Sequence, residues 1–309
     1  MKTTICSLLL LLCGLSMHAQ NLYSRAFGNP NNQAVVFLHG GPGYNCANFE
    51  GTTAQALADK GFFVIVYDRR GEGRSSSEGA EFTFKQTFND LNELYSRYGI
   101  QKAMLIGHSF GDIVALLYTK QFPERVHSIV LTGAPLSLQE SFAQIIERCK
   151  KIYQAKNDST NLNYLSMLEK MDKSTLQYSS FCFAHAMQNG FYSPQKPTEE
   201  ALKLYQQWRE DTTLSQYGSQ MTPQAPQGFW QNEHYTTLDL TETVQSLKQM
   251  DVSIYGVYGQ DDGLYSEAQI EKLKSLIGAS HVFYWEQCSH NVFIDQQKKF
   301  IDAIGIWGQ

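Results

Sequence analysis

A serine flanked by glycines stands in the stretch Gly107-His108-Ser109-Phe110-Gly111. The apolar run 103–106 before it is typical of a buried strand, and an apolar-periodic helix begins directly after it. In that context G-x-S-x-G is a nucleophile elbow, a tight turn that lifts the serine hydroxyl out of the sheet and needs glycines where a Cβ would meet backbone. The predicted chemistry is nucleophilic attack by Ser109, with the positive end of the helix where an oxyanion would form.

A serine nucleophile needs a general base, and the base needs a group that orients it. Downstream, Asp261 and Asp262 follow one apolar strand-like run, and His290 follows the last such run. The carboxyl ends of parallel strands lie at one edge of a sheet, the edge that also carries the elbow. We therefore expect His290 to be the base for Ser109, oriented by Asp262 or by Asp261.

An oxyanion needs two backbone N–H donors. Phe110, directly after the nucleophile, is expected to supply one of them. The loop His39-Gly40-Gly41-Pro42-Gly43 follows a buried strand of the sequence Ala-Val-Val-Phe-Leu. Its glycines let the backbone approach a ligand closely, and Gly41 is the expected second donor.

Strand-like apolar runs alternate with helical patterns over most of the chain. The predicted strands are 22–27, 34–38, 62–67, 103–106, 128–133, 252–259 and 281–285, and the main predicted helices are 49–60, 82–98, 266–277 and 292–304. Such alternation predicts an α/β fold, with a mostly parallel sheet and helices on both of its faces.

The alternation stops between residues 139 and 247, which show helical patterns and many aromatic residues but no strand of the buried type. We predict that 139–247 is an inserted helical cap over the carboxyl ends of the strands, where open α/β sheets keep their sites. The core domain would then consist of residues 21–138 and 248–309.

Composition excludes several classes of function. The chain has 309 residues, 42% of them hydrophobic and 18% charged, with a formal net charge of −5. An acidic balance argues against an extended nucleic-acid interface. After residue 20 no run is long and apolar enough to span a bilayer. The motifs imply no metal and no cofactor, and the expected partner is a small molecule or a short peptide that serves as substrate.

Residues 1–20 have the features of a secretory signal peptide: Lys2, an apolar stretch over 5–15, and the small residue Ala19 near the end. We expect cleavage after Ala19 or Gln20 and a periplasmic or secreted protein; the alternative is an uncleaved anchor.

Four cysteines remain after residue 20, namely Cys46, Cys149, Cys182 and Cys288. Export would permit disulfides. Cys149 with Cys182 is the first candidate pair because both lie in the inserted segment. The alternative is that the cysteines are buried free thiols.

Several motifs taken together resemble a known family. They are His39-Gly40-Gly41-Pro42-Gly43, Asp68-Arg69-Arg70-Gly71 with Gly73-Arg74-Ser75, Gly107-His108-Ser109-Phe110-Gly111, Gly259-Gln260-Asp261-Asp262 and Ser289-His290. This set resembles the α/β-hydrolase superfamily and, within it, most of all the proline iminopeptidases. The resemblance covers about 34–138 and 250–305, and it implies an α/β-hydrolase fold and a Ser-His-Asp triad that releases an N-terminal proline. The family pattern Gly-x-x-Asp falls on Asp262, which favours Asp262 over Asp261.

The sequence also departs from the iminopeptidase pattern. Those enzymes usually have Gly-Gly-Ser-Trp-Gly at the elbow, whereas Gly-His-Ser-Phe-Gly is the form common in esterases. Arg69 replaces the glutamine of their Asp-Gln-Arg-Gly motif, and Asp112 stands where a small residue is usual.

The family binds the free amine of its substrate with two glutamates of the cap. The matching stretches here are Trp208-Arg209-Glu210 and Asn232-Glu233-His234-Tyr235, each with its acid one place later, which on a helix turns the side chain by about 100°. Glu210, Glu233 and Trp208 are the resulting candidates for substrate binding. The alternatives are a small-molecule esterase or lactonase, and a non-catalytic ligand-binding protein on a hydrolase fold.

Overall fold

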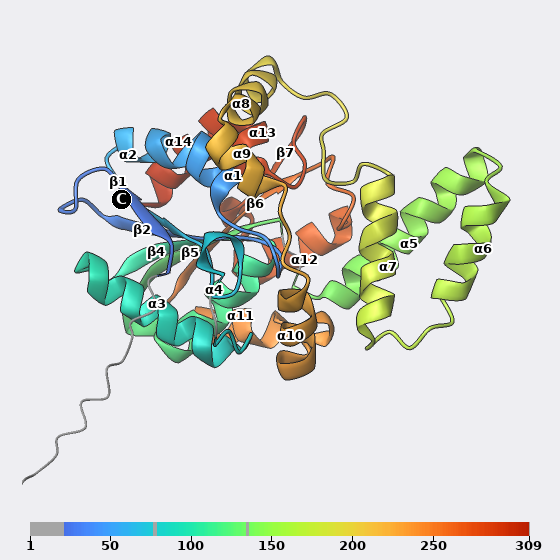
Figure 1. Cartoon of the computed structure of the whole chain (residues 1–309), viewed down its shortest axis with the longest axis horizontal. Helices are drawn as coiled ribbons and strands as arrows, with labels where there is room; N and C mark the ends of the chain where they lie inside the picture. Colours follow the sequence, from blue (N-terminus) through green and yellow to red (C-terminus); the bar gives the residue numbers. More distant parts are fainter. Residues whose placement is uncertain (1–21, 77–78, 134–135, 309) are drawn as a thin grey trace, which may run out of the picture.

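The computed structural model describes residues 22–76, 79–133 and 136–308 (Figure 1). The predicted signal peptide, 1–20, lies outside this range. Within the described part of the chain, no helix has both the length and the apolar character needed to cross a membrane.

A seven-stranded sheet forms the centre of the molecule, with strand order β1-β3-β2-β4-β5-β6-β7. The strands are β1 (Ser24–Phe27), β2 (Ala34–Leu38), β3 (Phe63–Tyr67), β4 (Ala103–His108), β5 (Val126–Thr132), β6 (Ser253–Gly259) and β7 (Val282–Trp285). Only the pairing of β1 with β3 is antiparallel among these strands; the other pairings are parallel. The prediction of a mostly parallel α/β sheet is therefore confirmed.

Helices cover both faces of the sheet because its central strands are apolar on both sides. In β2, Val36 and Leu38 belong to one hydrophobic cluster, whereas Val35 and Phe37 belong to the other. The first cluster contains residues of α3 (Phe84–Tyr98), α4 (Phe110–Gln121), α11 (Thr241–Gln249) and α12 (Glu267–Ile277). The second contains residues of α1 (Ala47–Phe49), α2 (Gln55–Asp59), α13 (Val292–Asp295) and α14 (Gln297–Trp307).

Two of the predicted helices are interrupted. The segment expected to be one helix over 49–60 consists of α1, the π-helical turn η1 (Glu50–Ala54) and α2. The last helix divides into α13 and α14 at Gln296, whose φ of −135° is not helical. The Gln296 side chain donates to the carbonyl oxygen of Glu286 (2.9 Å), and this contact fixes the break against the end of β7.

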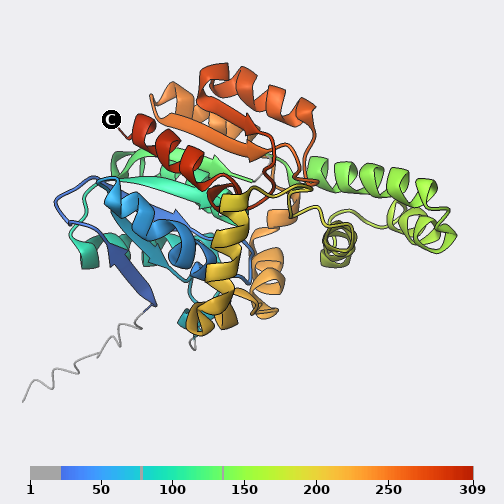
Figure 2. The same ribbon diagram turned by 90° about the horizontal axis from the view of Figure 1, so that it is seen from above.

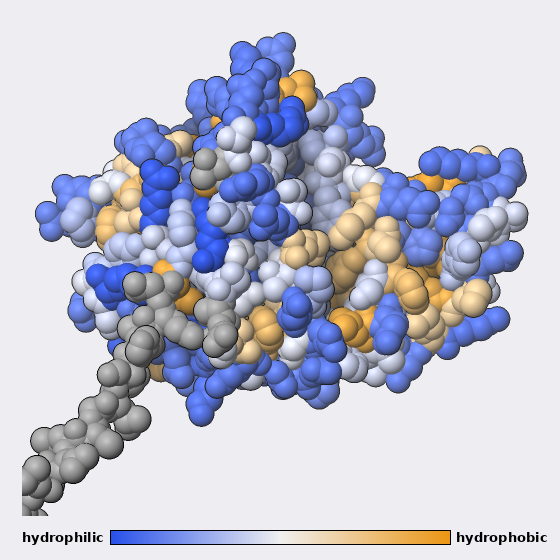
Figure 3. All heavy atoms as spheres, in the orientation of Figure 1, coloured by the Kyte–Doolittle hydropathy of each residue, from blue (hydrophilic) through white to orange (hydrophobic). Residues whose placement is uncertain are grey.

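Besides α11, six α-helices of the described residues lie between β5 and β6 along the chain: α5 (Leu138–Ala155), α6 (Ser159–Leu168), α7 (Leu176–Gln188), α8 (Glu199–Glu210), α9 (Thr212–Gly218) and α10 (Gln224–Glu233). The first three form an arm that projects from the sheet in both ribbon views (Figures 1 and 2). The arm carries the exposed apolar side chains of Tyr164, Met167, Phe181 and Met187, and Figure 3 shows apolar surface over it.

The remaining inserted helices pack on the core. Helix α8 contacts α13 and η1, and the Phe229 ring of α10 lies 4.9 Å from the Phe110 ring at the start of α4. The inserted segment therefore reaches the core through both α8 and α10.

The four cysteines of the described chain are buried free thiols, so the expected Cys149–Cys182 disulfide is wrong. The two residues lie on α5 and α7, but the Cys149 sulfur is directed to other groups. It lies 3.8 Å from the carbonyl oxygen of His185 and accepts from Asn189 Nδ2 at 3.5 Å. Burial raises the pKa of Cys149 to about 11 and that of Cys182 to about 12.

Candidate active site

Ser109 lies at the turn between β4 and α4, with φ 54° and ψ −118°. A positive φ is uncommon for a residue with a side chain and marks a strained turn. The Ser109 N–H donates to the carbonyl oxygen of Thr132 (2.9 Å) and so fixes the turn to β5. Gly111 is needed because a Cβ there would come within 2.7 Å of the carbonyl carbon of Leu38. The turn therefore depends on glycine at the position that passes β2.

Asp112, which departs from the family pattern, has a structural explanation. Its buried carboxylate accepts the backbone N–H of Thr132 through both oxygens at 3.0 Å. It fills the space beside Gly107, where a Cβ would lie 2.7 Å from the Asp112 nitrogen. Asp112 thus joins the first turn of α4 to the end of β5.

His290 and Asp262 are in direct contact. His290 Nδ1 lies 2.8 Å from Asp262 Oδ2, and both side chains are buried, Asp262 completely. The other carboxylate oxygen, Oδ1, accepts from the Leu264 N–H (2.9 Å), so the carboxylate is held in place on both sides. Asp261 turns the other way, and its Oδ2 accepts from the Gln195 N–H at 3.2 Å. Of the two aspartates, Asp262 is the one that can orient the imidazole.

His108, the residue before the serine, reaches the loop of His290. Its Nε2 donates to the carbonyl oxygen of His290 at 3.1 Å, and the two rings lie 4.8 Å apart. Burial, and to a lesser extent the neighbouring His290, lower the pKa of His108 well below its usual value. His108 is therefore neutral and acts as a donor. From the sequence, His108 was notable only because histidine at this position of the elbow motif is common in esterases.

Residues that follow α7 also contact His290 and its loop. The Tyr192 ring stands edge-on to the His290 ring, 5.0 Å away at an interplanar angle of 89°. The carbonyl oxygen of Phe191 accepts from Ser289 Oγ at 3.1 Å. This segment of the inserted region is therefore attached to the histidine loop and packs against the imidazole.

Asp295 of α13 binds the backbone of the loop that carries His290. Its Oδ2 accepts the Ser289 N–H (2.8 Å), and its Oδ1 accepts from the hydroxyl of Tyr205 on α8 (2.9 Å). Burial raises the pKa of Asp295 to about 6. No sequence motif pointed to Asp295, since it follows the strand–loop pattern by several residues and looks like an ordinary helical acid.

Arg148 of α5 ties the arm to the loop that carries the aspartates. Its guanidinium donates to the carbonyl oxygens of Asp262 (3.3 Å) and Tyr265 (3.1 Å). A hollow of about 330 Å³ lies beside it, bordered by Asn189 and Asp261 among others.

The glycine-rich loop after β2 lies next to the elbow. A Cβ on Gly40 would be 3.3 Å from the Ser109 Cβ, and Gly41 has φ 114°, a conformation suited to glycine. The loop is also contacted by the inserted segment, because the Thr222 N–H donates to the carbonyl oxygen of Gly43 at 2.8 Å. Gly41 and Phe110, the expected oxyanion donors, thus come from two loops that meet at Ser109.

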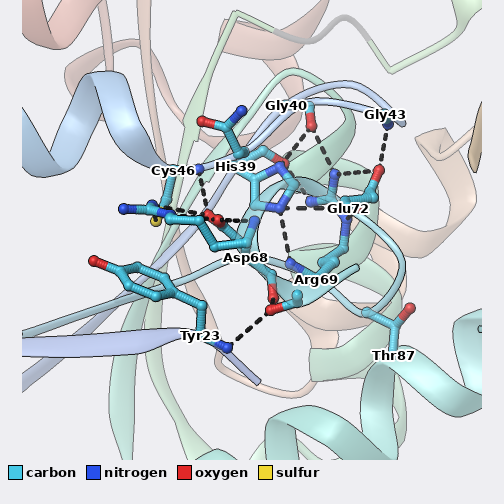
Figure 4. A network of polar contacts seen from close by, with 12 residues as sticks. Tyr23, His39, Gly40, Gly43, Cys46, Asp68, Arg69, Glu72 and Thr87 are labelled. Atoms are coloured by element: carbon cyan, nitrogen blue, oxygen red, sulfur yellow. Dashed lines mark hydrogen bonds and ion pairs between the residues drawn. The ribbon is translucent and has the colours of Figure 1, made fainter. Parts of the chain in front are cut away.

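A buried polar network lies beneath this glycine-rich loop (Figure 4). Arg69 and Glu72 form an ion pair at 2.6 Å, both with almost no exposed surface. Burial raises the pKa of Glu72, and the Arg69 guanidinium opposes that rise. Burial, and next Arg69, lower the pKa of His39 well below its usual value, so that His39 is neutral.

A second ion pair closes the same region. Arg74 Nε donates to Asp68 Oδ2 at 2.8 Å, and Asp68 Oδ1 accepts the Cys46 N–H at 2.8 Å. Burial alone would raise the pKa of Asp68, but the hydrogen bond from Arg74 and the charges around it lower it. The Asp68-to-Ser75 loop is thereby fixed to the start of α1.

The candidate substrate-binding residues of the inserted segment lie as follows. Glu210 is exposed at the end of α8 and accepts from Gln206 Nε2 (2.9 Å). Glu233 is half-buried, and its Oε1 accepts the N–H of Phe84 (2.7 Å) at the start of α3. Trp208 packs on Gly51 of η1, whose Cβ would lie 3.0 Å from the indole. Among the contacts of the described residues, none joins these three side chains to the serine, the histidine or Asp262.

A parallel sheet with a serine elbow after β4 and a buried Asp–His pair beyond β6 and β7 defines a class of protein. The chain belongs to the α/β hydrolase fold family, which matches residues 33–297. A probable proline iminopeptidase of Leptolyngbya boryana is 33% identical over 114 residues, 36% of this chain but only 35% of that relative's length.

Two further comparisons extend over nearly the whole chain. The proline iminopeptidase of Lactobacillus delbrueckii subsp. bulgaricus is 26% identical over 300 residues, which cover 92% of this chain and 93% of the relative. The crystal structure of a proline iminopeptidase-related protein from Thermus thermophilus superposes with a TM-score of 0.63 at 22% identity, covering 93% and 92% of the two chains. The latter likeness concerns the fold.

Proposed function

We propose that this protein is a serine hydrolase that works through Ser109, His290 and Asp262. The observation that carries the proposal is the 2.8 Å contact between His290 Nδ1 and a fully buried Asp262, at the sheet edge where Ser109 occupies a strained elbow. A buried carboxylate that accepts from Nδ1 fixes the imidazole tautomer and leaves Nε2 free to act as a base.

The reaction follows from these positions. Ser109 Oγ attacks the carbonyl carbon of the substrate, and its proton passes to His290 Nε2. The tetrahedral oxyanion is stabilised by the N–H groups of Phe110 and Gly41. The Ser109 N–H takes no part because it is already bonded to Thr132. His290 then protonates the leaving group, and a water activated by His290 releases the acyl group from the serine.

The proposed substrate is a peptide with an N-terminal proline. The support is the resemblance of the His-Gly-Gly-Pro-Gly loop and the likeness to the Lactobacillus proline iminopeptidase over 92% of the chain. An aminopeptidase also needs a carboxylate for the substrate's ammonium group. Glu233 is the better candidate of the two glutamates, because it is half-buried and lies on α10, the helix that packs on Phe110.

A small acyl ester or lactone is the second candidate. The specific observation in its favour is that Glu210 is exposed and that Glu233 is already bonded to the Phe84 N–H. An ester substrate has no amine and requires no such carboxylate.

Two assays on the purified chain test these proposals. A fluorophosphonate probe should label Ser109 in the wild type and should not label the Ser109→Ala variant, which separates an enzyme from a non-catalytic binding protein. The rates of hydrolysis of prolyl p-nitroanilide and of p-nitrophenyl acetate and butyrate are then compared to separate the two substrate classes. Absence of both labelling and hydrolysis in the folded protein would end the serine-hydrolase proposal.

We also infer that the protein is exported and loses residues 1–19 or 1–20, and that residues 139–247 act as the cap on a core of 21–138 and 248–309. The composition of the leader and the position of α5 to α10 between β5 and β6 support these inferences. Mass spectrometry of the protein recovered from the periplasm or medium of a bacterial host tests the first; an intact Met1 would contradict it.

A further inference from the structure

Arg69 lies under the glycine-rich loop with only 2% of its surface exposed. Its guanidinium donates to three partner residues there (Figure 4). Nη1 donates to the carbonyl oxygen of His39, Nη2 donates to the carbonyl oxygen of Gly40 at 2.6 Å, and Nε donates to Glu72 Oε2 at 2.6 Å. One buried cation thus binds two successive carbonyl groups of the loop.

The geometry of the peptide unit makes this contact relevant to the oxyanion. The Gly40 carbonyl and the Gly41 N–H belong to one planar peptide group, and in a trans peptide they point in opposite directions. A donor that holds the Gly40 oxygen on one side therefore sets the direction of the Gly41 N–H on the other. Hydrogen bonding to that oxygen also polarises the amide and strengthens its N–H as a donor.

A second donor reaches the same oxygen. His39 Nε2 accepts from the backbone N–H of Arg69 (3.0 Å), so the neutral imidazole carries its proton on Nδ1. His39 Nδ1 then donates to the Gly40 oxygen at 2.9 Å. Glu72 balances the charge of Arg69 and also accepts the N–H of Gly43. The loop is thereby held both before and after Gly41.

Arg69 also contacts the other half of the oxyanion site. Its guanidinium carbon lies 5.0 Å from the centre of the Phe110 ring, within the range of a cation–π contact. Phe110 carries the second proposed donor. A single side chain therefore binds the peptide group that contains the Gly41 N–H and packs against Phe110, which carries the other donor.

We propose that Arg69, with Glu72 as its counter-ion, is a positioning residue that aims and polarises the Gly41 N–H at the oxyanion. This proposal rests on the proposed serine-hydrolase function. It also accounts for the arginine at a place where the similar iminopeptidase motif has glutamine. A neutral amide side chain cannot bind two carbonyls and a carboxylate through one planar fork, as a guanidinium does.

Two variants test the proposal without leaving an unpaired buried charge. Arg69→Gln/Glu72→Gln removes both charges together, and Arg69→Lys keeps the pair but loses the planar fork. The matched control is Arg70→Gln, since the neighbouring Arg70 pairs with Asp90 of α3 (3.0 Å). Active sites are counted by burst titration, so that each rate refers to folded enzyme, and the affinity for a trifluoromethyl ketone that forms a tetrahedral adduct is measured alongside.

We expect the double variant to lose roughly 10- to 100-fold in kcat per titrated site, with KM within threefold, because complete loss of one oxyanion donor costs on the order of 10²–10³. The affinity of the double variant for the trifluoromethyl ketone should fall by a similar factor. In Arg69→Lys, kcat and the ketone affinity should both fall less. In Arg70→Gln, both should stay at the wild-type values. These paired losses are not expected of a residue that only stabilises the fold.

The proposal is overturned if the double variant keeps kcat and ketone affinity within twofold of wild type, or if only KM or the melting temperature changes. Wild-type protein labelled at Ser109 by the fluorophosphonate would show in that case that the hydrolase function stands and that Arg69 alone was misassigned. A wild type without labelling or turnover would refute the proposed function and this inference with it.

Discussion

The Nε2 atom of His108 lies 3.1 Å from the carbonyl oxygen of His290, so the residue before the serine holds the backbone of the loop that carries the other histidine. Elbow and base come from positions 182 residues apart in the chain. Because both rings are buried, this bond is made in a low-dielectric environment and its loss would leave the carbonyl oxygen without that donor.

Replacing His108 by alanine should therefore affect both stability and rate. An unsatisfied buried acceptor costs about 1–3 kcal/mol, and a displaced His290 should lower kcat by about tenfold while KM changes little. Denaturant unfolding and steady-state kinetics measure the two effects. The control is His127→Ala, at an exposed histidine of β5. Equal behaviour of the two variants would contradict the bridging role of His108.

The two neighbouring aspartates should differ sharply when each is changed to asparagine. Asp262→Asn should reduce kcat by about 10⁴-fold, because the amide favours the wrong imidazole tautomer. Asp261→Asn should cost less than tenfold, since its carboxylate bonds the Gln195 N–H and not the histidine. Steady-state rates on the same ester substrate make the comparison. A reversed order would move the acid to Asp261 and leave the enzyme class intact.

The raised pKa of Asp295 predicts how stability depends on pH. Burial raises this pKa from 3.8 to about 6, so between those values the folded protein binds more protons than the unfolded chain. The contribution of Asp295 to stability is then largest below pH 4 and declines as the pH rises through 6, by about 2 kcal/mol between pH 4.5 and 7.5. Asparagine at 295 can still accept from Ser289 and does not titrate.

Asp295→Asn should consequently gain stability relative to wild type on going from pH 4.5 to 7.5. Urea unfolding at both pH values measures the change, and subtraction of the two proteins removes the contributions of the other titrating groups. If the difference between variant and wild type is the same at both pH values, the carboxyl of Asp295 titrates as in the unfolded chain and this prediction fails.

Glu233→Gln tests whether the inserted segment recognises an amine. Glutamine keeps an oxygen for the Phe84 N–H, so the fold should be retained, whereas the loss of a partly buried charge partner costs a few kcal/mol. KM for prolyl p-nitroanilide should rise more than tenfold, and KM for p-nitrophenyl acetate should stay within twofold. Glu210→Gln, at an exposed carboxylate, is the comparison. Unchanged kinetics with the prolyl substrate in both variants would favour the ester alternative.

The sequence by itself determined the order of strands and helices, because each buried strand is a short apolar run and each surface helix has an apolar stripe. It also located the elbow, since Gly107 and Gly111 follow from local clashes that any strand-to-helix turn of this kind must avoid. The parallel arrangement of the strands was enough to predict that Ser109, His290 and the two aspartates lie at the same edge of the sheet. All of these rest on short-range physical constraints.

The tertiary structure decided the features that depend on which side chains meet. Asp262 and Asp261 are chemically identical neighbours, and only the path of the loop after β6 turns one of them to His290. The free thiols of α5 and α7 and the bond of Glu233 to α3 depend in the same way on the packing of helices. Arg69 appeared in the sequence only as an exception to a motif. Its partners, the carbonyl groups of another loop, leave no trace in the sequence because every residue has a carbonyl group, and only the fold selects which ones a buried guanidinium can reach.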